Sequence, residues 1–277
     1  NKVALVTGGS MGIGKGIALS LGREGCRLSI CARNSGNLAV AAKEIEDATG
    51  AEVLGIPADL TKPEDAEAFI TGSVAHYGRI DILVNNAGSA PGGMIDHLSE
   101  QDWEQSLQLK FMGYVRCLKH ALPIMQKQKW GRVVNLIGND GVKPSYLEIA
   151  PGAANAAGQN MTVCLAAQYG KDNISICAVN PGPVRTERWA GLVAAGLLLP
   201  EGKPRRLYAE AGLARALGDF VGEDGGVQSR SPLSQMDMLE LLTELAACYR
   251  SMKIEPPKFV GAVSELLVPP LLAVVHG

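Results

Sequence analysis

The chain has 277 residues and a formal net charge of −2, with 26 lysines and arginines against 28 aspartates and glutamates. Hydrophobic residues make up 47% of the chain and charged residues 19%, which is enough for a sizeable core and excludes a disordered chain. The balanced charge and the aromatic content of 5% give no reason to expect a nucleic-acid partner.

Apolar runs alternate with helical patterns through the first 180 residues. Uninterrupted runs of Val, Ile and Leu are typical of strands buried on both faces of a parallel sheet, and strands that alternate with helices indicate an α/β fold. We therefore expect a Rossmann-like doubly wound parallel sheet. The expected strands are 3–6, 27–32, 52–57, 82–85, 132–137 and 174–179. The expected helices are 16–23, 38–49, 63–77, 100–126 (interrupted near Gly113 and Pro123) and 152–168.

The composition changes after Thr186. Residues 190–253 contain Gly-, Pro- and Arg-rich pieces and one helix-like run, 236–249. We expect residues 187–253 to be an insertion over the sheet edge, within a single domain that spans 1–277. No charge-free apolar run reaches the roughly 18 residues of a membrane span, and no signal peptide opens the chain, so we expect a cytoplasmic protein with no membrane partner.

The spacing of cysteines and histidines indicates free thiols and no metal site. The six cysteines form no CxxC pair, and a chain of this length does not depend on disulfides. The four histidines lie far apart, without the spacing of metal ligands.

A glycine-rich turn joins the first expected strand to the first helix and reads Thr7-Gly8-Gly9-Ser10-Met11-Gly12-Ile13-Gly14. Glycine lets the backbone turn sharply and come close to a pyrophosphate, and the N-terminus of the next helix offers unpaired N–H groups to it. A position between a strand and a helix is the context that a dinucleotide-binding motif requires. A tight turn without a ligand is the alternative.

The ends of the second and third strands supply further cofactor candidates. Arg33 and Asn34 stand where an acidic residue would bind the ribose of NAD, and a cation there suits a 2′-phosphate, so NADP(H) is favoured over NAD(H). An ordinary solvated arginine is the alternative. Asp59 precedes Leu60 after the third strand, where its carboxylate can accept a hydrogen bond from an adenine amino group. Alternatively, Asp59 caps the helix that begins near Pro63.

The glycine-rich turn and two further motifs make the chain resemble the short-chain dehydrogenase/reductase (SDR) family over residues 1–188. The glycine-rich turn matches the family's TGxxxGxG, residues 85–88 match its NNAG, and residues 180–186 contain the PG of its nicotinamide-side motif. The resemblance implies an NAD(P)-dependent oxidoreductase with a small-molecule substrate. It also implies a homodimer or homotetramer formed through the long helices near 100–126 and 152–168. The cofactor-binding residues expected from the motifs and strand ends together are Gly8, Ser10, Met11, Gly12, Ile13, Gly14, Arg33, Asn34, Asp59, Leu60, Asn86, Gly88, Pro181, Gly182, Val184 and Thr186.

In this family a late insertion covers the substrate site as a lid. The apolar run 192–199 within the expected insertion favours an apolar substrate. The stretch from Glu255 to Gly277 looks like a late family segment that normally precedes one more strand, so we expect the C-terminus, like the N-terminus, to be trimmed.

The resemblance also predicts an altered active site. The family uses Asn, Ser, Tyr and Lys for catalysis. The neighbouring residues that match the family pattern place Lys110, Gly138, Pro151 and Asn155 at those four positions. The changes at 110 and 155 are a reciprocal exchange between two side chains that are near neighbours in the family. We predict that Lys110 brings its ammonium to the region of the usual lysine and that Asn155 fills the gap. A coincidental lysine on a helix surface is the alternative.

The sequence does not identify the group that replaces the tyrosine acid. Tyr146 is the only tyrosine in the loop 139–148, and the nearby charge of Lys143 could lower the pKa of its phenol. A pocket-wall aromatic is an equal interpretation. The candidate catalytic residues are therefore Lys110, Tyr146 and Asn155. Three functions remain open: an oxidoreductase with a non-canonical active site, an inactive nucleotide-binding pseudoenzyme, and an enzyme of redox-neutral chemistry.

Overall fold

The computed structural model describes residues 2–181 and 254–276, with the backbone alone for 268–276, and the single positions 214, 239, 242, 243, 245, 246, 249 and 250. The chain divides into two compact units, Asn1–Gly182 and Pro183–Gly277. The first unit is a single Rossmann-like α/β domain, which confirms the expected fold class. The described element of the second unit is helix α10 (Lys258–His276).

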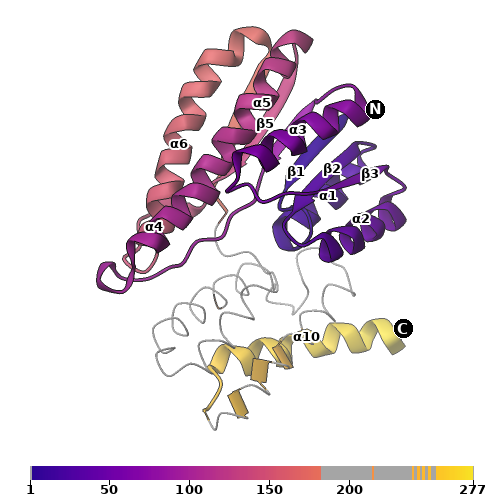
Figure 1. Cartoon of the computed structure of the whole chain (residues 1–277). Coiled ribbons are helices and arrows are strands. Elements are labelled where there is room, and N and C mark those ends of the chain that lie inside the picture. The colour runs from indigo at the N-terminus through magenta and orange to yellow at the C-terminus, as the bar shows by residue number, and fades with distance from the viewer. Residues whose placement is uncertain are drawn as a thin grey trace. The chain divides into compact units, whose positions relative to one another are not determined.

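The first unit is built on six parallel strands in the order β3-β2-β1-β4-β5-β6 (Figure 1). The order reverses between β1 and β4, and in such sheets ligands bind beyond the carboxyl ends of the strands at the reversal. The strands are β1 (Val3–Thr7), β2 (Arg27–Ala32), β3 (Val53–Pro57), β4 (Ile82–Asn85), β5 (Gly131–Leu136) and β6 (Ile174–Val179).

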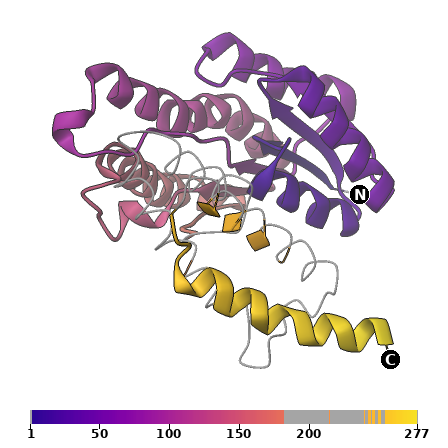
Figure 2. The same cartoon turned by 90° about the horizontal axis from the view of Figure 1, so that it is seen from below.

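Helices cover both faces of the sheet, and Figure 2 shows the same arrangement from below. One face packs on α1 and α2 through a core that includes Ala18 and Leu38, and the other packs on α3, α5 and α6 through a core that includes Phe69 and Leu118. The helices are α1 (Gly12–Arg23), α2 (Ser35–Thr49), α3 (Pro63–Tyr77), α4 (Glu100–Leu107), α5 (Gly113–Gln128) and α6 (Ile149–Tyr169). Shorter elements are the 3₁₀ turns η1 (Ile95–His97), η3 (Asn139–Gly141) and η4 (Gly170–Asp172), and the π-helix η2 (Gln108–Met112).

The long helical stretch after β4 differs from its prediction at one of two points. The expected interruption near Gly113 is real and takes the form of the π-helix η2. The expected break at Pro123 is wrong, because Pro123 lies inside α5 without ending it. Its neighbours Leu122 and Met125 are buried in the core, and this packing outweighs the one backbone hydrogen bond that proline removes.

Two other boundaries matter for the site. Helix α1 begins at Gly12, directly from the glycine-rich turn, and α6 begins at Ile149, three residues before the expected start. Pro151 therefore lies in the first turn of α6, where backbone N–H groups have no partner within the helix and a proline is tolerated. Strands β3 and β6, the two edges of the described sheet, are only partly buried, so the expectation of burial on both faces does not hold there.

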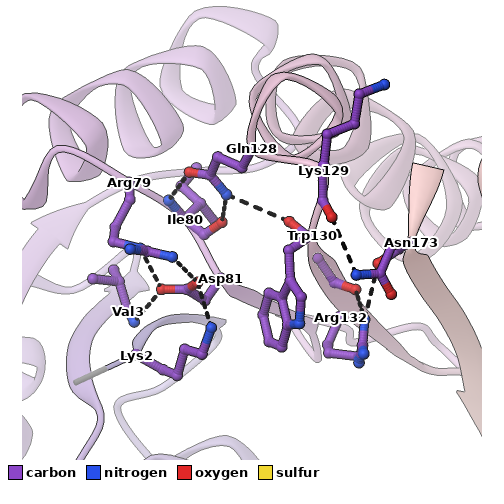
Figure 3. A network of polar contacts seen from close by, with 11 residues as sticks. Lys2, Val3, Arg79, Ile80, Asp81, Gln128, Lys129, Trp130, Arg132 and Asn173 are labelled. Carbon is purple, nitrogen blue, oxygen red and sulfur yellow. Dashed lines mark hydrogen bonds and ion pairs between the residues drawn. The ribbon is translucent and has the colours of Figure 1, made fainter.

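The amino ends of β1, β4 and β5 meet in a polar network at the edge of the sheet opposite the carboxyl ends of the strands (Figure 3). The side chain of Asp81 has no exposed surface and accepts hydrogen bonds from Arg79, from Lys2 and from the N–H of Val3. Burial by itself would raise the pKa of Asp81, but these donors together hold that pKa below its ordinary value. The network therefore fixes an ionised carboxylate at the base of the sheet.

The expected insertion at 187–253 lies almost entirely outside the described residues, and so does its apolar run 192–199. In the part of the chain that is described, no helix combines the length and apolar character needed to cross a membrane.

Candidate active site

The turn between β1 and α1 has the geometry of a phosphate-binding loop. Gly8 and Gly12 have positive φ angles, of 67° and 53°. A Cβ atom at Gly14 would lie 2.1 Å from the carbonyl oxygen of Gly8, so no larger residue fits there. The turn is therefore as tight as a close approach to a pyrophosphate requires.

Helix α1 leaves its N-terminus open to an anion. Its cap residue, Met11, supplies no side-chain hydrogen bond, and the first turn contains no acidic residue. The first N–H groups of the helix are thus satisfied by no capping side chain, and the helix dipole favours negative charge at this point. Ser10 is half-buried in the turn, and Ile13 packs against the core on the α1 side of the sheet.

A clamp between β1 and β4 holds this turn in place. The side-chain amide of Asn86 donates to the carbonyl oxygens of Thr7 and Gly8, at 2.9 and 3.2 Å. The hydroxyl of Thr7 accepts from the N–H groups of Asn86 and Ala87, both at 2.9 Å. Thr7 is the first residue of the TGxxxGxG motif but is not among the cofactor-binding residues expected from the sequence.

The residues after β2 have different roles. Arg33 is exposed to solvent, so its guanidinium is accessible to the 2′-phosphate of a bound cofactor. The side chain of Asn34 accepts from the N–H of Asn37 and caps α2, so its oxygen serves the helix.

The residues after β3 correct one alternative. Asp59 is not the cap of α3: the cap position is Lys62, and Asp59 accepts from the N–H and the hydroxyl of Thr61. The side chain of Leu60 is buried in the core, which leaves only its backbone for a cofactor, and its carbonyl oxygen already accepts from Arg116.

Lys110 lies in the π-helix η2, and π-helical turns are frequent at functional sites. Its stem runs over Gly88, where a Cβ atom would come within 2.9 Å of Cε. Its Nζ donates to Oδ1 of Asn155 at 2.7 Å, with part of the side chain still accessible. The prediction that these two residues are neighbours is confirmed, and the catalytic role of Lys110 stays a prediction.

Gly138, at the end of β5, completes this cluster. A Cβ atom on Gly138 would lie 3.4 Å from Nζ of Lys110 and 2.5 Å from Nδ2 of Asn155. Asn155 is only 2% exposed, and its Nδ2 has no hydrogen-bond partner. Pro151 is buried one turn earlier on α6 and offers no donor. The structure thus brings three of the four positions that are expected to be altered into contact around one ammonium group.

The loop after β5 carries the other catalytic candidate. Tyr146 is 74% exposed, and no hydrogen bond joins it to another described residue. Lys143 is exposed as well. The role of Tyr146 therefore stays a prediction. The loop is tied to the one after β4 by a bridge between Gly93 and Glu148.

Exposed apolar side chains lie on the segments that follow the carboxyl ends of β1, β4 and β5. They include Met11, Ile95, Val142, Tyr146 and Ile149. Apolar groups in such a position favour contact with an apolar ligand.

Cysteine chemistry does not compete at this site. The described cysteines are free thiols. Burial raises the pKa of Cys31, which lies under the glycine-rich turn, and raises that of Cys117 to about 12. Both groups are therefore protonated and unreactive at neutral pH.

The segment after β6 is only partly described. Pro181 accepts at its carbonyl oxygen from the N–H of Asn139, at 3.2 Å, and so ties this segment to the loop after β5. Gly182, Val184 and Thr186 lie outside the described residues.

Comparison with known proteins gives consistent matches. Residues 2–195 match the protein-family model for short chain dehydrogenase. A putative ketoacyl reductase from Streptomyces coelicolor is 36% identical over 189 residues, 67% of this chain and 72% of that protein. A 3-oxoacyl-[acyl-carrier-protein] reductase from Staphylococcus epidermidis is 33% identical over 66% of this chain and 75% of its own. The crystal structure of L-sorbose reductase from Gluconobacter frateurii, complexed with NADPH and L-sorbose, is 28% identical with a TM-score of 0.71, and covers 80% of this chain and 82% of that chain.

Proposed function

Because the chain belongs to the short-chain dehydrogenase/reductase family, and is an oxidoreductase by that membership, we propose that it reduces a carbonyl group of an apolar small molecule with NADPH. The direction and the carbonyl substrate are supported by the relatives, two of which are named as ketoacyl or oxoacyl reductases. The apolar substrate is supported by the exposed apolar side chains around the site.

The described residues fit a dinucleotide. The glycine-rich turn and the open N-terminus of α1 would hold the pyrophosphate, and Arg33 would pair with the 2′-phosphate of NADPH. When bound, the nicotinamide supplies the hydride. The complex of L-sorbose reductase with NADPH is consistent with this preference for NADPH.

The active site works without the family's usual residues in this proposal. We infer from the motifs on either side that Lys110, Gly138, Pro151 and Asn155 stand in the places of Asn, Ser, Tyr and Lys. The observation that carries the proposal is the 2.7 Å hydrogen bond from Lys110 to Asn155, next to Gly88 and Gly138 at the carboxyl end of the sheet. It keeps a cation at the site although the usual lysine is absent.

The ammonium of Lys110 has two tasks. It stabilises the negative charge that develops on the substrate oxygen, and it donates the proton that completes the alcohol. The resulting neutral amine regains its proton from solvent, to which the half-buried side chain has access. The phenol of Tyr146 is the second candidate for this proton.

The test begins with binding. Calorimetry should give a clearly tighter complex with NADPH than with NADH, and absorbance at 340 nm should then fall with apolar ketones or 3-oxoacyl thioesters. Lys110→Met should lower kcat by about 100-fold, the lower end of the usual contribution of a general acid. Absence of nucleotide binding would contradict the proposal, and binding without hydride transfer to any substrate would favour the inactive alternative.

A homodimer or homotetramer is part of the same proposal. Helix α6 presents small and apolar side chains to solvent, among them Ala153, Ala156 and Val163, the last 65% exposed. Such a face suits close packing against a second copy. Light scattering after size-exclusion chromatography should give an assembly that Val163→Glu disrupts, and a monomeric wild-type chain would contradict this part.

A further inference from the structure

The two ends of the Asn155 side chain have opposite surroundings. An ammonium group can only donate, so the amide oxygen must be the end that faces Lys110 at 2.7 Å. The amide nitrogen must then be the end that faces Gly138. This orientation follows from the chemistry of the partners and leaves Nδ2 buried without an acceptor.

Gly138 provides the space that this orientation needs. Its φ angle of 138° is one that residues with a side chain rarely adopt. Any Cβ atom at 138 would also lie 2.5 Å from Nδ2 of Asn155 and 3.4 Å from Nζ of Lys110. A serine at 138 would therefore displace the amide or the ammonium, so the three positions depend on one another.

Stability alone would favour an aspartate at position 155. Aspartate has the same shape, would still accept from Lys110, and would remove the buried N–H that has no partner. It would also add a negative charge beside the ammonium. The neutral amide instead fixes the position of the ammonium without cancelling its charge.

We propose that Asn155 and Gly138 are positioning residues. They hold the Lys110 ammonium at the place where the substrate oxygen binds, and they add no negative charge beside it. The catalytic part rests on the proposed function, because it requires Lys110 to act on that oxygen. The dependence of Lys110, Gly138 and Asn155 on one another for their positions, which we call the interlock, does not rest on the proposed function. It is measured without turnover.

Among the described helices packed against the π-helix η2, α4 and α5 carry charged side chains. Helix α6 carries no charged side chain along its whole length. Helix α4 carries Glu100, Asp102 and Glu104, helix α5 carries Arg116, Lys119, His120 and Lys127, and Glu148 precedes α6. These groups are the same in every variant below, so a change in the pKa of Lys110 reports on positions 138 and 155.

The decisive variant is Asn155→Asp, with Asn155→Leu as its matched apolar control. A carboxylate raises the pKa of Lys110 and makes it a weaker acid, so we expect a higher melting temperature but a kcat at neutral pH that falls about 10- to 100-fold. Asn155→Leu removes the acceptor, so the pKa of Lys110 should fall and the pH profile of kcat should move with it. Competitive acetylation of Lys110 with acetic anhydride, followed by peptide mass spectrometry, measures this pKa without turnover.

Gly138→Ala tests the interlock from the other side. It leaves Lys110 and Asn155 in the sequence but should shift the acetylation pKa of Lys110 in the same direction as Asn155→Leu. If Asn155→Asp raises that pKa and keeps kcat within twofold of the wild type, the positioning role is refuted. Acetylation that is unchanged in both Asn155 variants refutes the interlock, even if Gly138→Ala does not fold. Shifts as expected in a chain without turnover refute the proposed function and support the interlock.

Discussion

Asp81→Asn removes the carboxylate from the network at the base of the sheet and should lower the free energy of unfolding. The carboxylate has no exposed surface, forms salt bridges with Arg79 at 2.6 Å and Lys2 at 3.2 Å, and accepts from the N–H of Val3 at 2.9 Å. Breaking a buried ion pair by removing one partner costs about 3–5 kcal/mol. The side chains of Lys2 and Arg79 are each 44% exposed and can be solvated, and the amide keeps one acceptor oxygen. We therefore expect a smaller cost of about 2 kcal/mol, or a melting temperature lower by about 4–8 °C.

The same substitution has a defined pH dependence. The pKa of Asp81 is lower in the folded chain than the value of about 3.9 in the unfolded chain. The stabilisation is therefore complete above the unfolded pKa and is lost as the pH falls through the folded pKa. The gap between wild type and variant should be constant from pH 7 to about 5 and should narrow below about pH 4.

Thermal unfolding followed by circular dichroism between pH 7 and 3.5 measures this gap. Asp47→Asn is the matched control, because Asp47 pairs with Lys43 on the exposed face of α2. We expect it to change the melting temperature by less than about 1 °C, as is usual for surface pairs. A decrease below about 2 °C for Asp81→Asn, or an equal gap at pH 7 and at pH 3.5, would refute the reasoning.

Three further predictions concern the site. Gly14→Ala places a Cβ atom 2.1 Å from the Gly8 carbonyl oxygen, so calorimetry should show NADPH affinity at least about tenfold weaker, and unchanged affinity would contradict a tight turn. Arg33→Ala should weaken NADPH binding by about tenfold and leave NADH binding unchanged, since only NADPH carries the 2′-phosphate; equal losses would remove Arg33 from cofactor selection. Tyr146→Phe should lower kcat by less than Lys110→Met does, because the phenol is 74% exposed; the reverse order would make Tyr146 the proton donor.

The sequence predicts the strands well because each is a short apolar run bounded by turn residues, and three of the six strands agree with the structure at both ends. It also predicts the contact of Lys110 with Asn155, since a reciprocal exchange is informative only if the two side chains meet. It does not predict the π-helix at 108–112 or the continuation of α5 through Pro123. Both depend on tertiary packing that a local pattern does not contain.

The orientation of Asn155 is beyond sequence reasoning for a related reason. The spacing places Gly138 and Asn155 at the edge of one site. Only the folded backbone shows that the amide of Asn155 needs the space that a side chain at position 138 would fill. Loop side chains such as Tyr146 are the least predictable, because neither periodicity nor a buried face fixes them.

A single lysine at position 110 requires several accommodations in the surrounding structure. Gly88 leaves room for its stem, since a Cβ there would lie 2.9 Å from Cε, and Gly138 leaves room for its ammonium and for the amide that fixes it. The Asn155 amide accepts the hydrogen bond at 2.7 Å at the expense of a buried N–H without an acceptor. A polar group left unsatisfied in a core is destabilising, and a catalytic role is one explanation for such a group. The cluster therefore supports the proposal of a site rebuilt around Lys110, and the Asn155 and Gly138 variants distinguish that proposal from a site that has lost its chemistry.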